Sequence, residues 1–380
     1  MWCIGKLTAL VAFATLSTAT AIQKRGPTCS DVSFNVNINV LNFNLTGLDP
    51  NNLLGTFGSL LNPTLSVAVS GNFHIAGRFC EPEVVNPSRQ NTLQFLVHGA
   101  TYTRDYWTGK GFNGDQYSWV DYASKQGYPT LAIDRLGNGA SDHPDPILVV
   151  QYPTQTEAIH KVLQAIRSGA GNSLPRQFSK IIYVGHSYGS IVGNALTSKY
   201  PTDVDSIVLT GYSSVFYYTT QTIAGLAVFA PASITDPARF GNLSPGYVQT
   251  INRDGVREVF YRAPNYDPGM EDLDWRTRGT QTVGELASSF LGAKEKSLLF
   301  AGPVYVVTGQ YDYIFCGGDC GTTDTSGPVA NTRENYPLAA TLGKGFDSHI
   351  VQGTAHCWQL HYAAHDAFVN VHQWLERKGF

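Results

Sequence analysis

The sequence predicts an α/β protein with a mostly parallel central sheet, helices on both faces of the sheet and a helical cap insertion. Three observations support this prediction. Short, nearly continuous apolar segments alternate with longer amphipathic ones, as in strands that are buried by the helices between them. One such strand runs directly into a glycine-flanked serine and a helix. The alternation stops at residues 213–300 and resumes afterwards, which indicates an inserted segment.

Most elements can be assigned from the spacing of apolar residues and from the glycines and prolines at their ends. At residues 33–40 apolar residues alternate with serine and asparagine, which is the period of a half-buried strand. Strands are predicted at residues 34–40, 73–80, 92–97, 129–133, 181–184, 207–209, 303–308 and 348–352. Helices are predicted at residues 48–61, 115–126, 155–167, 191–200 and 362–377.

These elements divide the chain into five expected parts. The region after the N-terminal signal is rich in asparagine and turn residues, whereas the inserted segment is rich in tyrosine, phenylalanine, alanine and proline. The expected parts are a signal peptide with a short pro-segment (1–25), an N-terminal extension (26–70), the first part of the core (71–212), the cap insertion (213–300) and the second part of the core (301–380).

Composition and charge exclude several classes of function. The chain has 380 residues, of which 43% are hydrophobic, so it is long enough to bury a large core. Its formal net charge is −3 and it has no lysine or arginine cluster. Nothing therefore favours binding to nucleic acid or to an anionic membrane surface. We expect a small-molecule partner instead.

The N-terminus has the pattern of a secretory signal. Lys6 is followed by an apolar run at 7–16 and by Ala-Thr-Ala at 19–21, a small-residue cleavage site. The apolar run is too short to cross a bilayer. The dibasic pair at 24–25 predicts further processing, with a mature N-terminus near Gly26. The sequence therefore predicts a secreted protein without integral membrane association.

Secretion makes disulfides expected. Five cysteines remain after removal of the signal, and this odd number leaves one unpaired within the chain. We expect Cys29 to pair with Cys80, and Cys316 with Cys320 across a short turn. Cys357 is an alternative partner for Cys316 or Cys320, and the sequence leaves this choice open. Asn44 and Asn242 begin N-x-S/T sequons and are candidate glycosylation sites.

The motif Gly-x-Ser-x-Gly at 185–189 predicts a catalytic serine. An apolar strand precedes it and a helix follows, which is the context of a sharp turn that exposes the hydroxyl of Ser187. Gly185 and Gly189 are expected because side chains would collide across so tight a turn. The N-terminus of the helix adds backbone N–H groups that stabilise an oxyanion.

A serine hydroxyl needs a base, and the base needs an orienting acid. Two later strands end in suitable residues: Asp312 follows the strand at 303–308, and His356 follows the strand at 348–352. We expect Ser187 to be the nucleophile, His356 the general base and then acid, and Asp312 the acid that orients His356. Other candidate acids do not directly follow a strand: Asp319, Asp324 and Asp347.

Two backbone N–H groups are expected to stabilise the oxyanion. One belongs to Tyr188, directly after the nucleophile, and the other to Ala100, in the loop after the strand at 92–97. His98 is expected to brace this loop. No cofactor or metal is predicted: the cysteines at 316 and 320 lack a second ligand pair, and His361 and His365 are expected on a solvated or partly buried helix face without a third ligand.

With these motifs in this order, the chain resembles the α/β-hydrolase fold family from about residue 73 to residue 380. The motifs that carry the resemblance are His98-Gly99, the turn at 134–142, Gly185-His186-Ser187-Tyr188-Gly189, Gly309-Gln310-Tyr311-Asp312 and the loop of His356. The turn is similar to that of capped epoxide hydrolases and dehalogenases. Those enzymes have an aspartate at the nucleophile position, so Ser187 argues for cleavage of esters, thioesters or amides. The N-terminal signal is similar to that of secreted fungal esterase-like and lipase-like members.

Aromatic residues in the cap predict a hydrophobic substrate. They are Tyr212, Phe216, Tyr217, Tyr218, Phe229, Phe240, Tyr247, Phe260, Tyr261, Tyr266 and Trp275, and we expect no more than a third of them to face the substrate. The leading hypothesis is a secreted serine hydrolase that cleaves a moderately hydrophobic carboxylic ester. Alternatives with the same triad are an acyltransferase or thioesterase of a secondary-metabolite or toxin pathway, or a peptidase. A binding protein on the same scaffold is the alternative of a different class.

Overall fold

The structure, a computed structural model, describes residues 1–2, 26–48, 64–170, 173–217, 228–321, 323–341 and 345–380. The expected signal segment after residue 2, the dibasic site and the expected helix at 48–61 beyond its first residue lie outside the described residues, as does Tyr218 in the cap.

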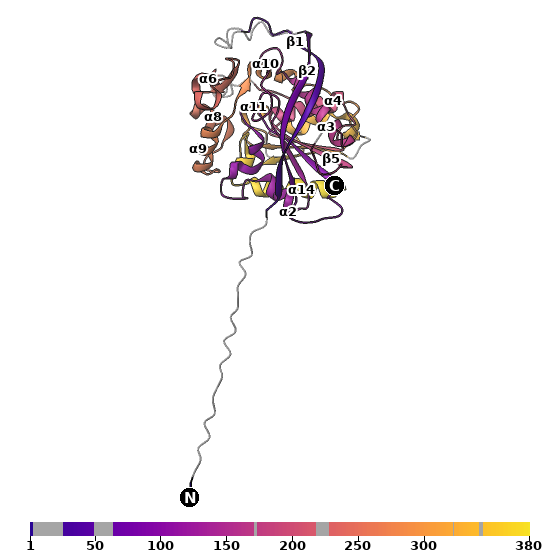
Figure 1. Cartoon of the computed structure of the whole chain (residues 1–380), viewed down its shortest axis with the longest axis vertical. Helices are drawn as coiled ribbons and strands as arrows, with labels where there is room; N and C mark the ends of the chain where they lie inside the picture. Colours follow the sequence, from indigo (N-terminus) through magenta and orange to yellow (C-terminus); the bar gives the residue numbers. More distant parts are fainter. Residues whose placement is uncertain (3–25, 49–63, 171–172, 218–227, 322, 342–344) are drawn as a thin grey trace.

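An eight-stranded sheet forms the centre of the molecule (Figure 1). Its strands are β1 (Thr28–Phe43), β2 (Leu65–Glu81), β3 (Thr92–Val97), β4 (Thr130–Ile133), β5 (Lys180–His186), β6 (Ser206–Thr210), β10 (Val304–Gly309) and β11 (Phe346–Val351). They lie in the order β1-β2-β4-β3-β5-β6-β10-β11. The six strands from β4 to β11 are parallel, whereas β1 and β2 are antiparallel to their neighbours. This confirms the predicted α/β fold.

Helices cover both faces of the sheet, which explains why the central strands are buried and mainly apolar. Every residue of β3, β4, β6 and β10 is buried. One face carries α3 (Tyr152–Ser168) and α4 (Tyr188–Lys199), and the other carries α2 (Trp119–Lys125) and α14 (Ala364–Arg377). On the second face, Gln94 of β3 accepts a hydrogen bond from Trp119 Nε1 at 2.7 Å and contacts His372 Nε2 at 3.1 Å. These buried polar contacts fix α2 and α14 against the sheet.

The long hairpin of β1 and β2 crosses the expected boundary between an extension and the core. The two strands pair from Thr28 with Glu81 to Phe43 with Leu65, and β2 continues the sheet through β4. The expected boundary at 70/71 therefore falls within β2. The predicted alternation is present, since side chains at 32, 34, 36 and 38 are buried and those at 33, 35, 37 and 39 are exposed. Period-2 alternation predicts a half-buried strand, but it does not say which sheet the strand joins.

The cap, defined here as residues 213–300, contains a small sheet that the sequence did not predict. Its strands are β7 (Phe229–Pro231), β8 (Tyr247–Thr250) and β9 (Gln281–Thr282). They have two to four residues each, too few to establish a period-2 pattern. The described cap helices are α6 (Ala232–Thr235), α7 (Pro237–Phe240), α8 (Arg253–Phe260), α9 (Pro268–Thr277) and α10 (Val283–Ala293).

Short helical turns occupy the remaining connections. They are η2 (Arg104–Gly111), α11 (Tyr313–Cys316), α12 (Gly327–Asn331), η3 (Thr332–Asn335), α13 (Pro337–Thr341) and η4 (Trp358–Leu360). The helix expected at 115–126 begins only at Trp119, because the side chain of Ser118 caps it by accepting a hydrogen bond from Asp121 N at 3.1 Å. In the described part of the chain, no helix is both long and apolar enough to cross a membrane.

The expected disulfide between Cys29 and Cys80 is present and joins the start of β1 to the end of β2. The two residues are 51 positions apart. A cross-link that closes a loop of this length restricts the unfolded chain strongly. The disulfide therefore stabilises the β1 edge of the sheet, which is the opposite edge from β10 and β11 in the strand order.

The variant Cys29→Ser/Cys80→Ser should unfold with a free energy lower by about 2–4 kcal/mol, because the unfolded chain gains conformational freedom. Denaturant titration of the purified protein measures this change. Turnover per folded molecule should stay unchanged at 25 °C. Loss of turnover in a variant that is still folded would contradict a purely structural role.

Candidate active site

The candidate nucleophile Ser187 lies in a strained turn between β5 and α4. Its backbone has φ 53° and ψ −116°, a region that residues other than glycine rarely adopt. A Cβ on Gly185 would lie 2.7 Å from the backbone of Gly189, and a Cβ on Gly189 would lie 2.2 Å from the carbonyl oxygen of Val97. Close backbone contacts therefore require both glycines, as the sequence motif predicted.

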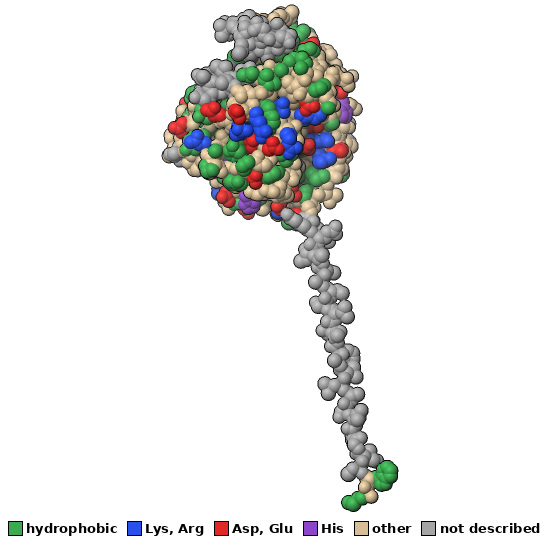
Figure 2. Space-filling model, turned by 90° about the vertical axis from the view of Figure 1, so that its left-hand side faces the viewer, with side chains coloured by type: hydrophobic (Ala, Val, Ile, Leu, Met, Phe, Trp, Pro, Cys, Tyr) green, Lys and Arg blue, Asp and Glu red, His purple; other side chains and the backbone are tan. Residues whose placement is uncertain are grey.

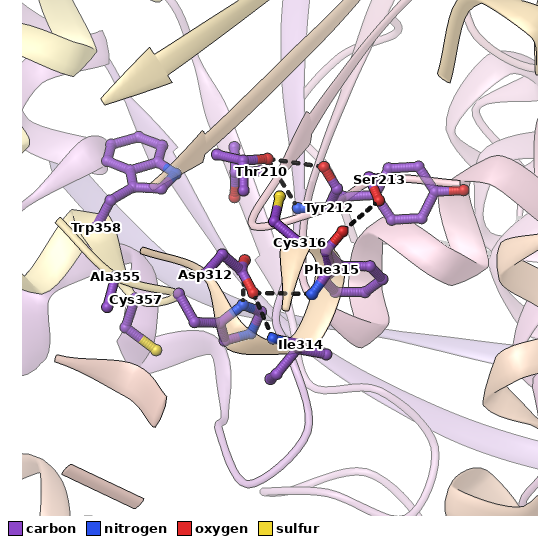
Figure 3. A network of polar contacts seen from close by, with 12 residues as sticks. Thr210, Tyr212, Ser213, Asp312, Ile314, Phe315, Cys316, Ala355, Cys357 and Trp358 are labelled. Atoms are coloured by element: carbon purple, nitrogen blue, oxygen red, sulfur yellow. Dashed lines mark hydrogen bonds and ion pairs between the residues drawn. The ribbon is translucent and has the colours of Figure 1, made fainter. Parts of the chain in front are cut away.

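The candidate acid and base form a buried hydrogen-bonded pair, and Figure 3 shows Asp312 in the network of polar contacts with Ile314 and Phe315. Nδ1 of His356 lies 2.8 Å from Oδ2 of Asp312, and the side chains are 1% and 0% exposed. The other carboxylate oxygen accepts hydrogen bonds from the N–H of Ile314 at 2.8 Å and of Phe315 at 3.0 Å. Because an ionised carboxylate only accepts, Nδ1 of His356 carries a proton and Nε2 is left for a second partner.

Ser187 and His356 line one pocket, and Asp312 lies beside His356. The three residues follow β5, β10 and β11, at the carboxyl edge of the parallel sheet. Among the described residues no hydrogen bond joins the Ser187 hydroxyl to His356. Such bonds are often longer before a substrate binds and shorten in the complex. The structure thus brings together the three side chains that the sequence singled out.

The surroundings of the Gly99–Ala100 peptide orient the amide of Ala100. The carbonyl oxygen of Gly99 lies 2.8 Å from Nδ1 of His98 and 3.2 Å from Nη2 of Arg135. A trans peptide points its C=O and N–H in opposite directions, so the N–H of Ala100 is held away from these donors. Ala100 and Tyr188 both line the pocket. The N–H of Tyr188 belongs to the first turn of α4, where donors have no partner within the helix.

His98 supports this loop as a neutral imidazole of fixed tautomer. The N–H of Arg135 donates to Nε2 of His98 at 3.1 Å, so the proton is on Nδ1 and is donated to Gly99 O. Burial, and then the charge of Arg135, lower the pKa of His98 well below its usual value. The imidazole therefore stays uncharged at neutral pH. Its contacts position the loop, in agreement with the bracing role expected from the sequence.

Arg135 joins this loop to the cap. Its Nε donates to the carbonyl oxygen of His98 at 3.0 Å, and its Nη1 forms an ion pair with Glu285 of α10. The two charged side chains are 0% and 1% exposed. The guanidinium also lies over the ring of Tyr188, 4.5 Å from the ring centre. One buried ion pair thus links the turn after β4, the loop after β3 and a cap helix.

The pocket lies between the candidate nucleophile and base on one side and the cap on the other. Its walls are mainly apolar. Besides the predicted residues, its lining includes Ile191, Phe216, Phe229, Phe260, Leu286, Ser289, Ile314 and Phe315. The sequence analysis did not single out the residues from α10. The start of α10 could have been recognised from the sequence, because Thr282 and Glu285 form a capping box there.

The aromatic residues of the cap divide into wall and packing residues. Of those predicted, Phe216, Phe229 and Phe260 line the pocket. How many of them face the substrate stays a prediction. Tyr212 and Tyr247 are fully buried packing residues instead.

Cys357 has a free, buried thiol, and Cys316 pairs with Cys320. Sγ of Cys357 lies 3.2 Å from the hydroxyl of Tyr102 and 3.8 Å from Nε2 of His186. Burial raises the pKa of the thiol well above its usual value, so it stays protonated. In the described part of the chain, Cys357, His186 and His356 form one group with ligand atoms within 4.8 Å of one another. A protonated thiol disfavours metal binding there, because metal ligands must be deprotonated.

The structure corrects the expected environment of His361. This residue precedes α14 and is 0% exposed, and is therefore not on a solvated helix face. Its Nε2 accepts a hydrogen bond from Arg262 N at 3.0 Å, and its Nδ1 donates to Cys357 O at 2.9 Å. Burial lowers the pKa of His361 to about 4. The imidazole of His361 thus serves as hydrogen-bond partner for two backbone groups near His356, the N–H of Arg262 and the carbonyl oxygen of Cys357. His365 is exposed, as predicted for the helix face.

Both sequon asparagines are exposed. Asn44 lies at the end of β1 and Asn242 in the loop before β8. Glycosylation at these two side chains stays a prediction.

The disulfide between Cys316 and Cys320 closes the loop that carries the candidate acid. Within it, the N–H of Gly318 donates to the carbonyl oxygen of Asp312 at 3.0 Å, and the N–H of Cys320 donates to that of Gln310 at 2.7 Å. The cross-link spans only four positions, so it restricts the unfolded chain little. Its main effect is to hold the backbone around Asp312.

The variant Glu285→Gln should be destabilised by about 3–5 kcal/mol, because it leaves the buried charge of Arg135 without a partner. The free energy of unfolding from denaturant titration measures the loss. Glu258→Gln, an exposed change in α8, is the matched control and should stay close to the parent. Equal stability of both variants would contradict the role assigned to the buried pair.

The variant Cys316→Ser/Cys320→Ser should lower kcat about tenfold through small displacements of the acid loop. Its stability loss should be below about 2 kcal/mol because the closed loop is short. Ester turnover and denaturant titration separate the two effects. The Cys29→Ser/Cys80→Ser variant, which should lose stability and keep kcat, is its counterpart. A fall in stability alone would contradict the positioning of Asp312 by this disulfide.

Comparison with known proteins supports the fold. No curated protein matches the sequence. A thermophilic esterase from Thermogutta terrifontis is similar in structure, with a TM-score of 0.51 and 13% identity over 91% of this chain and 100% of the esterase. A monoglyceride lipase from Saccharomyces cerevisiae has a TM-score of 0.51 and 14% identity over 80% of this chain and 92% of the lipase. At these identities the likeness concerns the fold. The model of the alpha/beta hydrolase family matches residues 94–371, and the chain therefore belongs to this family.

Proposed function

We propose that the protein is a serine hydrolase that cleaves a moderately hydrophobic carboxylic ester through an acyl-enzyme on Ser187. One observation carries this proposal: the buried Asp312–His356 pair and the strained Ser187 meet at one apolar pocket. A hydroxyl held out of the sheet beside an oriented imidazole is the arrangement that activates a serine.

In this proposal His356 Nε2 takes the hydroxyl proton as Ser187 Oγ attacks the ester carbonyl carbon. Asp312 stabilises the resulting imidazolium through the 2.8 Å hydrogen bond. The N–H groups of Ala100 and Tyr188 stabilise the oxyanion, and their positions cost no reorganisation during the reaction. His356 then returns the proton to the leaving alcohol as its C–O bond breaks. Water, deprotonated by His356, then attacks the acyl-enzyme, and His356 returns the proton to Ser187 Oγ as the acyl–Oγ bond breaks and the acid leaves.

The pocket supports an ester with an apolar arm. Side chains from α4 and α10 form one wall: Ile191 and Leu286. Phenylalanines from the cap and the acid loop form another, including Phe216 and Phe315. Burying an apolar arm here is favourable by about 25 cal/mol per Å² of surface. The two disulfides and the N-terminal signal pattern support secretion.

The variants Ser187→Ala and His356→Ala should each lower kcat on an aryl ester of a short fatty acid by roughly 10⁴-fold or more, and the double variant should be scarcely worse, because these residues act as a unit. Asp312→Asn should lose roughly 10⁴-fold. Initial rates with a series of acyl chain lengths measure these effects.

Cys357→Ser is the matched control, because Cys357 directly follows His356 and its thiol is the other side-chain group here that could act as a nucleophile. We expect it to keep its kcat within a few-fold. Activity that survives Ser187→Ala but is lost in Cys357→Ser would contradict the proposed nucleophile.

A further inference from the structure

A second, smaller pocket adjoins the active-site pocket beneath the cap. The two pockets share Thr101, Tyr102, Thr250 and Phe260 as walls. A substrate arm that leaves the active-site pocket on this side would therefore meet the residues of the second pocket. The distinctive residue of the second pocket is Arg278.

The guanidinium of Arg278 is only partly satisfied. Its Nη1 donates to the carbonyl oxygen of Trp275 at 2.7 Å, and its Nε donates to that of Thr250 at 3.3 Å. It also lies over the ring of Trp275, 3.9 Å from the centre. Arginine has five N–H donors, so three are left over. No ion pair of Arg278 is found among the described residues, and burial lowers its pKa.

The carboxylates nearby already have cationic partners. Glu271 lies 2.7 Å from Arg253 and 3.3 Å from Arg257. Asp274 lies 3.1 Å from Lys110 and accepts hydrogen bonds from two tyrosine hydroxyls. Neither Glu271 nor Asp274 is therefore free to bind a cation. The surface on the side of α6, α8 and α9 (Figures 1 and 2) also has acidic and basic side chains interspersed.

Asp236, whose charge attracts Arg278 from a distance, already has another cationic partner. It lies 2.6 Å from Nε of Arg239. Arg278 is therefore a partly desolvated cation that lines a pocket and has donors to spare. A desolvated charge gains most from a partner of opposite charge, and a planar guanidinium suits a carboxylate through two parallel hydrogen bonds.

We propose that this second pocket binds an anionic group, such as a carboxylate, on one arm of the ester, and that Arg278 recognises it. The inference rests on the proposed ester hydrolysis and narrows its substrate class to esters with one apolar and one acidic arm. The carbonyl of Thr250 links the two pockets, since Thr250 lines both and Arg278 bonds to it.

The test compares kcat/KM for matched esters of equal length. In the first pair, one ester ends its acyl arm in a carboxylate and the other in a methyl ester. In the second pair, the same two groups end the alcohol arm. An acyl choline serves as the cationic probe. The parent should favour the carboxylate in one of the two pairs. Arg278→Gln should reduce that preference about tenfold, the value of one charged hydrogen-bond interaction, and Arg278→Lys should keep most of it.

Arg276→Gln is the control, because Arg276 is exposed and pairs with Asp272 at 2.8 Å. It should leave the preference unchanged. Equal loss of turnover on neutral and anionic esters in Arg278→Gln would show that Arg278 only holds the cap, and would overturn the proposal. So would a preference for the acyl choline. Hydrolysis of neutral esters that depends on Ser187 but shows no anion preference would leave the proposed function standing and reject this inference alone.

Discussion

The close approach of two backbone turns is the constraint on which the candidate site depends. The turn of Ser187 packs so tightly against the end of β3 that a Cβ on Gly189 would lie 2.2 Å from the carbonyl oxygen of Val97. A Cβ on Gly99 would likewise lie 3.0 Å from that of Ser187. This contact exposes the serine hydroxyl and places it beside the Ala100 amide. Moving either turn apart would separate the proposed nucleophile from its proposed oxyanion donors.

Buried polar contacts hold the parts around this centre. Arg135 and Glu285 connect the loop of His98 to cap helix α10, and α10 contributes Leu286 and Ser289 to the pocket. The acid loop is held separately, by the hydrogen bonds of Asp312 and by the disulfide after it. One buried ion pair therefore ties the cap to the loop after β3, whereas the acid loop is held by contacts of its own. This explains how an apolar pocket keeps a defined polar side.

The sequence predicted the parts of the fold that have local signals. The buried strands are mainly apolar, and the turn of Ser187 has glycines that its backbone requires, so both could be recognised. Asp312 and His356 could be placed because each directly follows a strand. The strands of the cap could not be recognised, since β9 has only two residues.

Contacts between distant residues explain the rest. Arg135 and Glu285 are 150 positions apart, and no spacing rule joins them. The pairing of Cys316 with Cys320 rather than with Cys357 depends on the buried position of Cys357 beside Tyr102. The pairing of β1 with β2 could not be predicted, because the period-2 pattern of β1 gives its exposure and not its partner. That Arg278 has no ion pair among the described residues likewise depends on where the neighbouring charges lie.

The most direct test of the central claim, an activated Ser187, is labelling of the purified mature protein with a fluorophosphonate, followed by mass mapping of the modified peptide. The account predicts a single modified residue, Ser187, and no labelling of a folded Ser187→Ala variant. Labelling at another residue, or a folded parent protein that does not react, would contradict it.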